Sequence, residues 1–223
     1  MDRIPEPELM NDPAQALAYA RADFEQPHSQ FIAQFRACFP DWRGAGFVLD
    51  LGCGPGDICR RFAQAFPDTV IHGVDAAVAM LHIGRADLRA TQLDQRIELI
   101  KGYLPGAMLP REHYDAVISN SLLHHLHDPQ ALWQGVLRYA MPDAPVFVMD
   151  LRRPASRDEA TALVETYAAG EPEVLRSDFH HSLLAAYRVE EIYAQLRIAG
   201  IDWLCVEDLG DRHVIVYGYR PPP

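Results

Sequence analysis

The chain has 223 residues, of which 49% are hydrophobic and 23% charged, and this balance predicts one globular domain and excludes a disordered tail or a fibre. Lys and Arg number 20 and Asp and Glu number 31, so the formal net charge is −11. Nucleic acid is therefore disfavoured as a partner, because an acidic surface repels phosphate, although net charge does not exclude a local basic patch.

The cysteines and the N-terminus bear on the compartment. The four cysteines form no CxxC pair and have no regular spacing, unlike those of small secreted proteins. The first 13 residues hold acids and prolines where a secretion signal needs a basic start and an apolar stretch. No apolar run approaches the roughly 20 residues that cross a bilayer. We expect a cytoplasmic protein with no membrane span.

Short apolar strands alternate with amphipathic helices along most of the chain. Two helices are expected before the first strand, from Pro13 to Phe24 and on the face of Phe31, Phe35 and Phe39. Strands are expected at 47–51, 70–75, 97–101, 114–120, 145–150, 203–209 and 213–219.

The alternation of strands and helices predicts right-handed crossovers and a parallel sheet covered on both faces. The tight turn at Gly210 and Asp211 forces the last two strands to be antiparallel. The expected fold is therefore α/β, with a Rossmann-like seven-stranded, mostly parallel sheet that contains one antiparallel strand.

The segment from Val48 to Asp57 joins the first strand to the next helix and carries the strongest chemical signal. Gly52, Gly54 and Gly56 let the backbone turn sharply and approach a ligand closely. In the dinucleotide fingerprint GxGxxG, a pyrophosphate sits on the helix N-terminus. Here the third glycine comes one residue early, and Asp57 stands where the anion would be. A negative charge suits an ammonium or sulfonium ligand better than a diphosphate.

This segment resembles motif one, (V/I)LDxGxGxG, of the class I S-adenosylmethionine-dependent methyltransferases. Asp75, at the end of the second strand, matches their second mark. Residues 114–126 are similar to the fDxVxxxxvlHH segment of small-molecule methyltransferases. The similarity covers 46–150 by motif and 190–219 by strand order. It implies S-adenosyl-L-methionine as cofactor, S-adenosyl-L-homocysteine as product, and methylation of an O, N, S or C nucleophile of a small molecule.

The resemblance also implies a cofactor site. The three glycines would cradle the methionine part, Asp50 would lie beneath its ammonium, and Asp75 would accept both ribose hydroxyls. Met80 would pack on adenine or belong to the core. Many relatives carry an acid after the third strand, and this chain has Tyr103 instead. The predicted cofactor-binding residues are Tyr19, Asp50, Gly52, Gly54, Gly56, Asp57, Asp75, Ala76, Met80, Gly102, Tyr103, Leu104 and Asn120.

The histidines after the fourth strand are the candidates for catalysis. His124 or His125 would act as general base if the nucleophile must lose a proton, and a structural role is the alternative. With His127 they could ligate a metal by composition, but no carboxylate or cysteine stands at metal-ligand spacing, so no metal is predicted. Four further side chains are candidates for the pocket rim or for plain surface: Arg152, Arg153, His180 and His181.

The chain is expected to form a single methyltransferase domain over residues 1–223. Its parts are an N-terminal helical cover (1–45), a cofactor-binding core (46–153), a helical substrate-lid insertion after strand five (154–188), and a last helix with the C-terminal strand pair (189–223). Two other functions stay open: a protein or RNA methyltransferase, and a cofactor-binding partner subunit that does not methylate. A homodimer also stays open.

Overall fold

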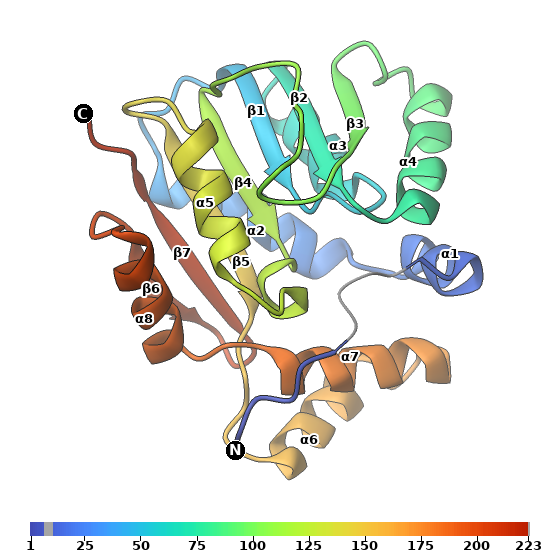
Figure 1. Ribbon diagram of the computed structural model, residues 1–223. Helices are drawn as coiled ribbons and strands as arrows, with labels where there is room; N and C mark the ends of the chain where they lie inside the picture. Colours follow the sequence, from blue (N-terminus) through green and yellow to red (C-terminus); the bar gives the residue numbers. More distant parts are fainter. Residues whose placement is uncertain (7–10, 223) are drawn as a thin grey trace.

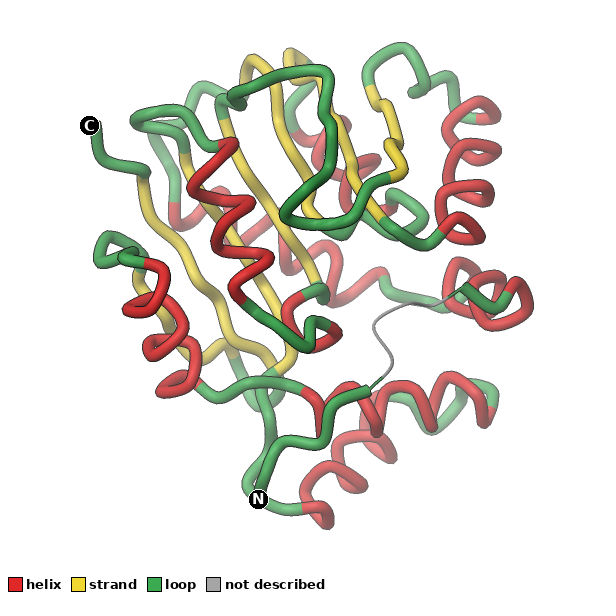
Figure 2. Tube along the Cα trace, in the orientation of Figure 1, coloured by secondary structure: helices red, strands yellow, loops and turns green. Residues whose placement is uncertain are grey.

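The computed structural model describes residues 1–6 and 11–222, and its centre is one seven-stranded sheet (Figures 1 and 2). The strands follow the order β3-β2-β1-β4-β5-β7-β6, and β7 runs antiparallel to both of its neighbours. The fold class predicted from the sequence is confirmed. The strands are β1 (Ala45–Leu51), β2 (Asp68–Asp75), β3 (Ile97–Lys101), β4 (Ala116–Asn120), β5 (Pro145–Leu151), β6 (Cys205–Leu209) and β7 (His213–Tyr219).

Helices cover both faces of the sheet and also its carboxyl edge (Figure 1). They are α1 (Pro13–Arg21), α2 (Glu25–Cys38), α3 (Asp57–Ala65), α4 (Val78–Ala90), α5 (Gln130–Tyr139), α6 (Arg157–Tyr167), α7 (Glu173–Ala185) and α8 (Val189–Ala199), with a short 3-10 helix, η1 (Leu123–His125), after β4. None of these described helices is both long and apolar enough to span a bilayer.

The two faces of the sheet have separate apolar cores. On one face α5 and α8 bury Trp133, Val136 and Ile192, and on the other α2 and α3 bury Phe31, Phe35 and Phe62. These side chains recur at helical spacing in the sequence, so burial of one stripe per helix explains why the segments are helical. Both layers keep the sheet rigid beneath the loops at its carboxyl edge.

The third layer lies across the carboxyl edge of the strands. Helices α6 and α7 pack on each other there, within the segment 154–188 (Figure 1). The N-terminal segment runs along α7, where the Ile4 amide donates to the Leu184 carbonyl at 3.0 Å. The Arg3 guanidinium donates to the Ala185 carbonyl at 2.5 Å. This layer therefore joins the start of the chain to its second half.

Strands β1 and β2 begin two residues before the predicted bounds, and β5 ends one residue after its predicted end. Two other strands begin later than predicted. Strand β4 begins at Ala116 and not at residue 114, because Tyr114 leaves the ladder to bridge Ala140 beside α5. Strand β6 begins at Cys205 and not at residue 203. Neither shift moves the carboxyl ends of the strands, where ligands of open α/β sheets bind.

Candidate functional site

The glycine loop after β1 is fastened to the end of β2 by hydrogen bonds. The amides of Gly52 and Cys53 donate to the Val74 carbonyl at 2.8 and 3.1 Å. The Asp75 carboxylate accepts from the Gly54 amide at 2.8 Å and from the Ala77 amide at 2.7 Å. Asp75 thus holds in place both the glycine loop and the turn that leads into α4. A carboxylate has about four lone-pair positions, so it keeps capacity for a ligand's hydroxyls.

Positive φ angles explain the glycines of this loop. Gly52, Gly54 and Gly56 have φ of 75°, 53° and 83°, a region that side chains rarely adopt. A Cβ added to Gly54 would meet no atom of the described residues within 4 Å, so the backbone there faces open space. A Cβ on Gly56 would meet Leu99 at 3.2 Å. Gly54 thus opens toward a ligand, whereas Gly56 serves the turn into α3.

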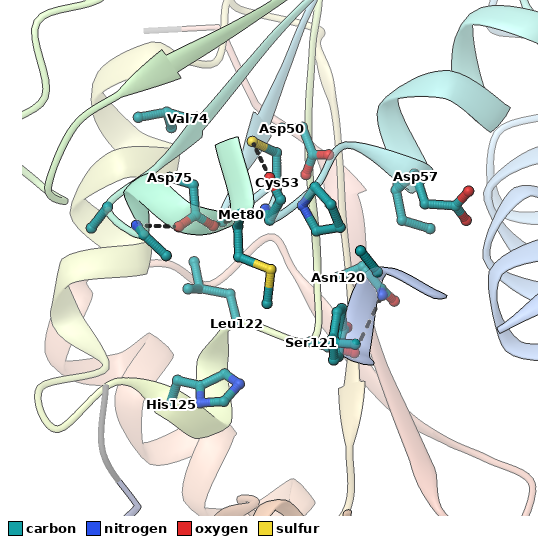
Figure 3. Close-up of a pocket in the computed structure, with 18 of the residues that line it drawn as sticks. Asp50, Cys53, Asp57, Val74, Asp75, Met80, Asn120, Ser121, Leu122 and His125 are labelled. Atoms are coloured by element: carbon teal, nitrogen blue, oxygen red, sulfur yellow. Dashed lines mark hydrogen bonds between the residues drawn. The ribbon is translucent and has the colours of Figure 1, made fainter. Parts of the chain in front are cut away.

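A first cavity of about 500 Å³ opens beside this loop (Figure 3). In Figure 3, Asp50 and Asp75 lie at one end and His125 at the other, with Met80 and Leu122 between them. Gly56 is not among the described residues that line this cavity, and its part in cofactor binding stays a prediction. The predicted residues that line the cavity are Tyr19, Asp50, Gly52, Gly54, Asp57, Asp75, Ala76, Met80, Gly102, Tyr103, Leu104 and Asn120.

Three of these lining residues differ in burial. Met80 is buried against Ala16 and Ala77, so the core role and the cavity role left open by the sequence coexist. Tyr103, in the place where many relatives carry an acid, leaves 58% of its surface exposed. Burial and the nearby Asp57 carboxylate raise the pKa of Tyr19 to about 12, so its hydroxyl keeps its proton. These side chains offer apolar surface and a neutral donor to a ligand.

Asp50 is a buried acid with one unpaired oxygen. Its Oδ2 accepts from the Cys59 thiol at 3.1 Å, whereas its Oδ1 has no hydrogen-bond partner among residues 1–6 and 11–222. Burial raises the pKa of this carboxyl from 3.8 to about 7. An unpaired buried acceptor is costly, so this site is suited to a ligand that brings a hydrogen-bond donor.

Asp57 corrects one interpretation made from the sequence. Its carboxylate accepts from His28 Nδ1 at 2.6 Å, from Arg61 Nε at 2.6 Å and from Arg60. Burial alone would raise the pKa of Asp57, but these partners hold it well below its usual range. The negative charge is therefore compensated within the protein, and Asp57 anchors α2 to α3 at the cavity rim.

A second cavity of about 260 Å³ adjoins the first. The two share the linker between α1 and α2, including Phe24, and the loop from Asn120 to His125. Its other walls come from α6, α7 and the turn into β7, with Tyr167, Leu175, Phe179, Ser182 and Arg212. The buried Arg212 donates to Gln26 at 2.9 Å and lies over the Tyr167 ring at 3.3 Å.

The two candidate catalytic histidines differ in their surroundings. His124 is buried, and its Nδ1 forms a short hydrogen bond with the buried Asp150. Burial alone would lower the pKa of His124, but the Asp150 carboxylate raises it above the usual value. His125 lines both cavities, and its ring lies 4.2 Å from that of His124. The structure therefore places His125 where ligands of the two cavities would meet.

Some rim candidates have structural roles. Arg153 is buried and binds the Glu191 carboxylate at 2.5 Å, and Arg152 donates to the Asp211 carbonyl at 2.9 Å. His180 and His181 are outside the walls of both cavities as the described residues form them. Sequence reasoning missed Glu6, Phe24, His28 and Arg212, which come from segments that carry no motif.

Comparisons with known proteins agree with this geometry. Residues 48–143 match the family model described as a methyltransferase domain. An uncharacterized methyltransferase of Mycobacterium tuberculosis is 28% identical over 62% of this chain and 68% of its own. A trans-aconitate 2-methyltransferase of Deinococcus radiodurans is 29% identical over 67% of this chain and 54% of its own. Protein arginine N-methyltransferase 1 of Dictyostelium discoideum is 34% identical over 58% of this chain, but the match spans 32% of that protein.

Solved structures show the same fold. A SAM-dependent methyltransferase from Aquifex aeolicus superposes with a TM-score of 0.69 over 93% of this chain and 98% of its own, at 19% identity. The plantazolicin methyltransferase BpumL, in complex with a triazolic desmethylPZN analog and SAH, superposes with a TM-score of 0.70 over 95% of this chain and 92% of its own, at 13% identity. Residues 48–143 form a methyltransferase domain, and these findings support a class I S-adenosylmethionine-dependent methyltransferase.

The first cavity of this methyltransferase fits its cofactor, S-adenosylmethionine. The unpaired Oδ1 of Asp50 suits the ammonium group, and the open backbone at Gly54 allows close approach of the methionine part. Asp75 stands at the end of β2, where it can accept from ribose hydroxyls in addition to its two backbone amides. The hydrogen-bond acceptors of this cavity thus match the ammonium and hydroxyl donors of S-adenosylmethionine.

Proposed function

We propose that this methyltransferase acts on a small molecule bound in the second cavity. The observation that carries the proposal is the position of that cavity, which adjoins the first through the 120–125 loop and is roofed by α6 and α7. Its volume of about 260 Å³ lies just below the roughly 300–1,000 Å³ of ordinary ligand pockets, which favours a small acceptor over a polymer. In this proposal residues 154–188 are the substrate lid, as the sequence predicts.

The chain's own residues bind and align the reactants. When bound, the cofactor supplies an electrophilic methyl group, so alignment is the main task of the protein. Asp50 and Asp75 would hold the two polar ends of the cofactor against the glycine loop. Tyr19 and Met80 would cover it. Leu175 and Phe179 of α7 would press the acceptor toward the shared loop and exclude water.

Proton removal from the acceptor is assigned to the histidines of the shared loop. His125 lies at the junction of the cavities, and His124 lies behind it on the second cavity. A base at such a place contributes about 10²–10⁴-fold to a rate. The names of two relatives point to different acceptors, trans-aconitate and protein arginine, and the small volume of the second cavity favours the small one. A cytoplasmic location and a homodimer stay predictions.

The acceptor class can be tested with labelled cofactor. Purified protein is incubated with methyl-tritiated S-adenosylmethionine and a cell extract, which is then split by ultrafiltration. We expect label from the enzyme in the low-molecular-weight fraction, as a product distinct from S-adenosylmethionine and its breakdown products. Label confined to the protein or RNA fraction would overturn the proposal.

Filling the second cavity gives a matched test. Leu175→Trp adds bulk to the wall of the second cavity and touches no residue of the glycine loop. A misplaced acceptor lowers the transfer rate by about 100-fold. Calorimetry should show unchanged affinity for S-adenosylhomocysteine. Exposed Val174, on the same helix, provides the control Val174→Trp, which should transfer methyl groups at the wild-type rate.

A further inference from the structure

Three metal-ligand side chains converge beside the second cavity, and none of them is among the residues predicted to bind the cofactor. Glu6 Oε1 lies 3.5 Å from His124 Nε2 and 3.2 Å from His125 Nδ1. One ligand atom from each residue lies within 4.8 Å of the others. The side chains of Glu6, His124 and His125 are 11%, 3% and 18% exposed, so the group is shielded from bulk water. The carboxylate that the sequence did not show beside the histidines comes from the N-terminal segment.

Asp150 determines which nitrogen of His124 faces the cluster. The carboxylate binds Nδ1 and also accepts from the Leu123 and Leu151 amides, each at 2.7 Å. Because Asp150 engages Nδ1, Nε2 is the nitrogen that points at Glu6. A histidine whose second nitrogen is bound by a carboxylate is the usual arrangement for a metal ligand, because the carboxylate orients the ring and raises its basicity.

Glu6 is positioned as firmly as the histidines. The Ser182 hydroxyl, on α7, lies 3.0 and 3.4 Å from the two carboxylate oxygens. Arg3 holds the preceding segment by donating to the carbonyls of His124 at 2.8 Å and Ala185 at 2.5 Å. The ligand atoms are therefore oriented before any ion binds. Such preorganisation raises affinity, because little order is lost on binding.

We propose that Glu6, His124 and His125 bind a divalent transition-metal ion of the Zn²⁺ type. With metal–ligand bonds of about 2.0–2.1 Å, two neighbouring ligand atoms stand about 3.0–3.4 Å apart. The observed separations of 3.2 and 3.5 Å approach this spacing, and 3.5 Å is long for an N–H···O hydrogen bond. Two imidazoles and one carboxylate select zinc, cobalt, nickel or iron over magnesium and calcium, which take oxygen ligands.

The three protein ligands leave coordination positions open, as catalytic metal sites do. His124, His125 and Ser182 line the second cavity, so an open position faces the acceptor, a step that rests on the proposed function. An acceptor hydroxyl or thiol bound there would release its proton to solvent more readily, so in the metal-bound protein the ion would replace the histidines as the cause of deprotonation. Its oxygen or sulfur then forms the bond to the methyl carbon, and the carbon–sulfur bond of the cofactor breaks with both electrons left on sulfur.

Metal binding is tested on the full-length chain without acceptor or cofactor, so its outcome is independent of the proposed function. The protein is stripped with a chelator, dialysed and titrated with Co²⁺ while visible absorption is followed, and Zn²⁺ is then added in competition. We expect one ion per chain, with Co²⁺ bands that Zn²⁺ abolishes. Glu6→Gln, which keeps a partner for Ser182, and His125→Ala should each weaken binding by about 100-fold or more.

His180→Ala is the matched control, because His180 belongs to α7 and lies outside the cluster. It should bind Co²⁺ like the wild type. Circular dichroism of each variant shows whether it folds, and the titration of the wild type decides the case if a variant does not. Wild-type protein that binds Zn²⁺ no more tightly than the His125→Ala variant would overturn the proposal and leave the cluster as an ion-paired anchor.

Discussion

The two cavities share a wall but are held together by different forces. The first is shaped by backbone groups at the ends of β1 and β2, which Asp75 fastens with two hydrogen bonds. The second is lined by side chains from the end of α1, the α1–α2 linker, the 120–125 loop, α6, α7 and the turn into β7. Its frame depends on buried charged groups, Asp150 and Arg212 among them. A site built from backbone groups keeps its shape when side chains are substituted, so it continues to fit the same ligand. A site built from side chains can come to fit a different ligand through substitutions.

The largest expected effect is the loss of the buried pair behind the second cavity. Asp150→Ala removes the acceptor of His124 Nδ1 and of the Leu123 and Leu151 amides. Removing one partner of a buried pair costs about 3–5 kcal/mol, and we expect the free energy of unfolding to fall by that amount. Urea denaturation measures it. Asp208→Ala, at an exposed acid on β6, is the control and should change stability by less than about 0.5 kcal/mol.

A smaller effect is expected in the first cavity. Asp75→Ala loses the two backbone hydrogen bonds and the proposed ribose contacts, each worth about 1.5–3 kcal/mol when charged. Affinity for S-adenosylhomocysteine should fall by at least about tenfold in calorimetry. Asp178→Asn changes a carboxylate of the second cavity and should leave this affinity unchanged. Equal losses in both variants would show that the two cavities do not bind separate ligands.

The smallest effect is a pH dependence carried by Asp50. In the cofactor-free protein its pKa is about 7, and a bound ammonium group would lower it, so binding releases a proton below pH 7. Affinity for S-adenosylhomocysteine should therefore rise with pH, by up to about tenfold per unit, and level off above pH 7. Titration in buffers of different ionisation enthalpy measures the proton release. Asp50→Asn should bind more weakly, with no such rise; a rise that persists would assign it to another group.

The raised pKa of Asp50 affects the stability of the protein in the opposite direction: stability falls as pH rises, whereas cofactor affinity rises. The folded chain holds the Asp50 proton up to about pH 7, whereas the unfolded carboxyl loses it near 3.8. Between these values the folded state binds more protons, so this carboxyl lowers the stability of the cofactor-free protein as pH rises. Asp50→Asn removes that contribution, which thermal unfolding at two pH values can resolve.

Sequence reasoning succeeded where the functional residues belong to the same local strand and turn patterns that determine the backbone conformation. Asp50, Gly54 and Asp75 lie at or just after the ends of strands with a clear apolar pattern. Parallel strands end at the same edge of a sheet, so these residues are expected to meet there. The strands at 97–101 and 213–219 have the predicted bounds because both are bordered by glycines or turns. The partners of Asp57 could not be predicted, since His28 and Arg61 reach it from positions that no local pattern reveals.

The second cavity shows why the rest could not be predicted. Glu6 lies 118 positions before His124, in a stretch whose prolines indicate only an extended chain. Its approach to the histidines depends on how Arg3 and Ser182 dock that stretch along α7. Contacts between side chains of separate elements leave no periodicity in a single sequence. The absence of a metal-ligand spacing therefore did not exclude a ligand cluster.

The α1–α2 linker has a thermodynamic consequence, because its residues face both cavities at once. The Phe24 ring contacts the Tyr19 ring at 4.8 Å and the His28 ring at 5.1 Å between centroids, so the three rings form one contiguous unit of the wall. Occupancy of either cavity changes the freedom of this unit and hence the affinity of the other. Linkage requires the change to be reciprocal: the factor by which cofactor tightens acceptor binding equals the factor by which acceptor tightens cofactor binding. An acceptor screen run with S-adenosylhomocysteine present would therefore detect weaker ligands than a screen of the free protein.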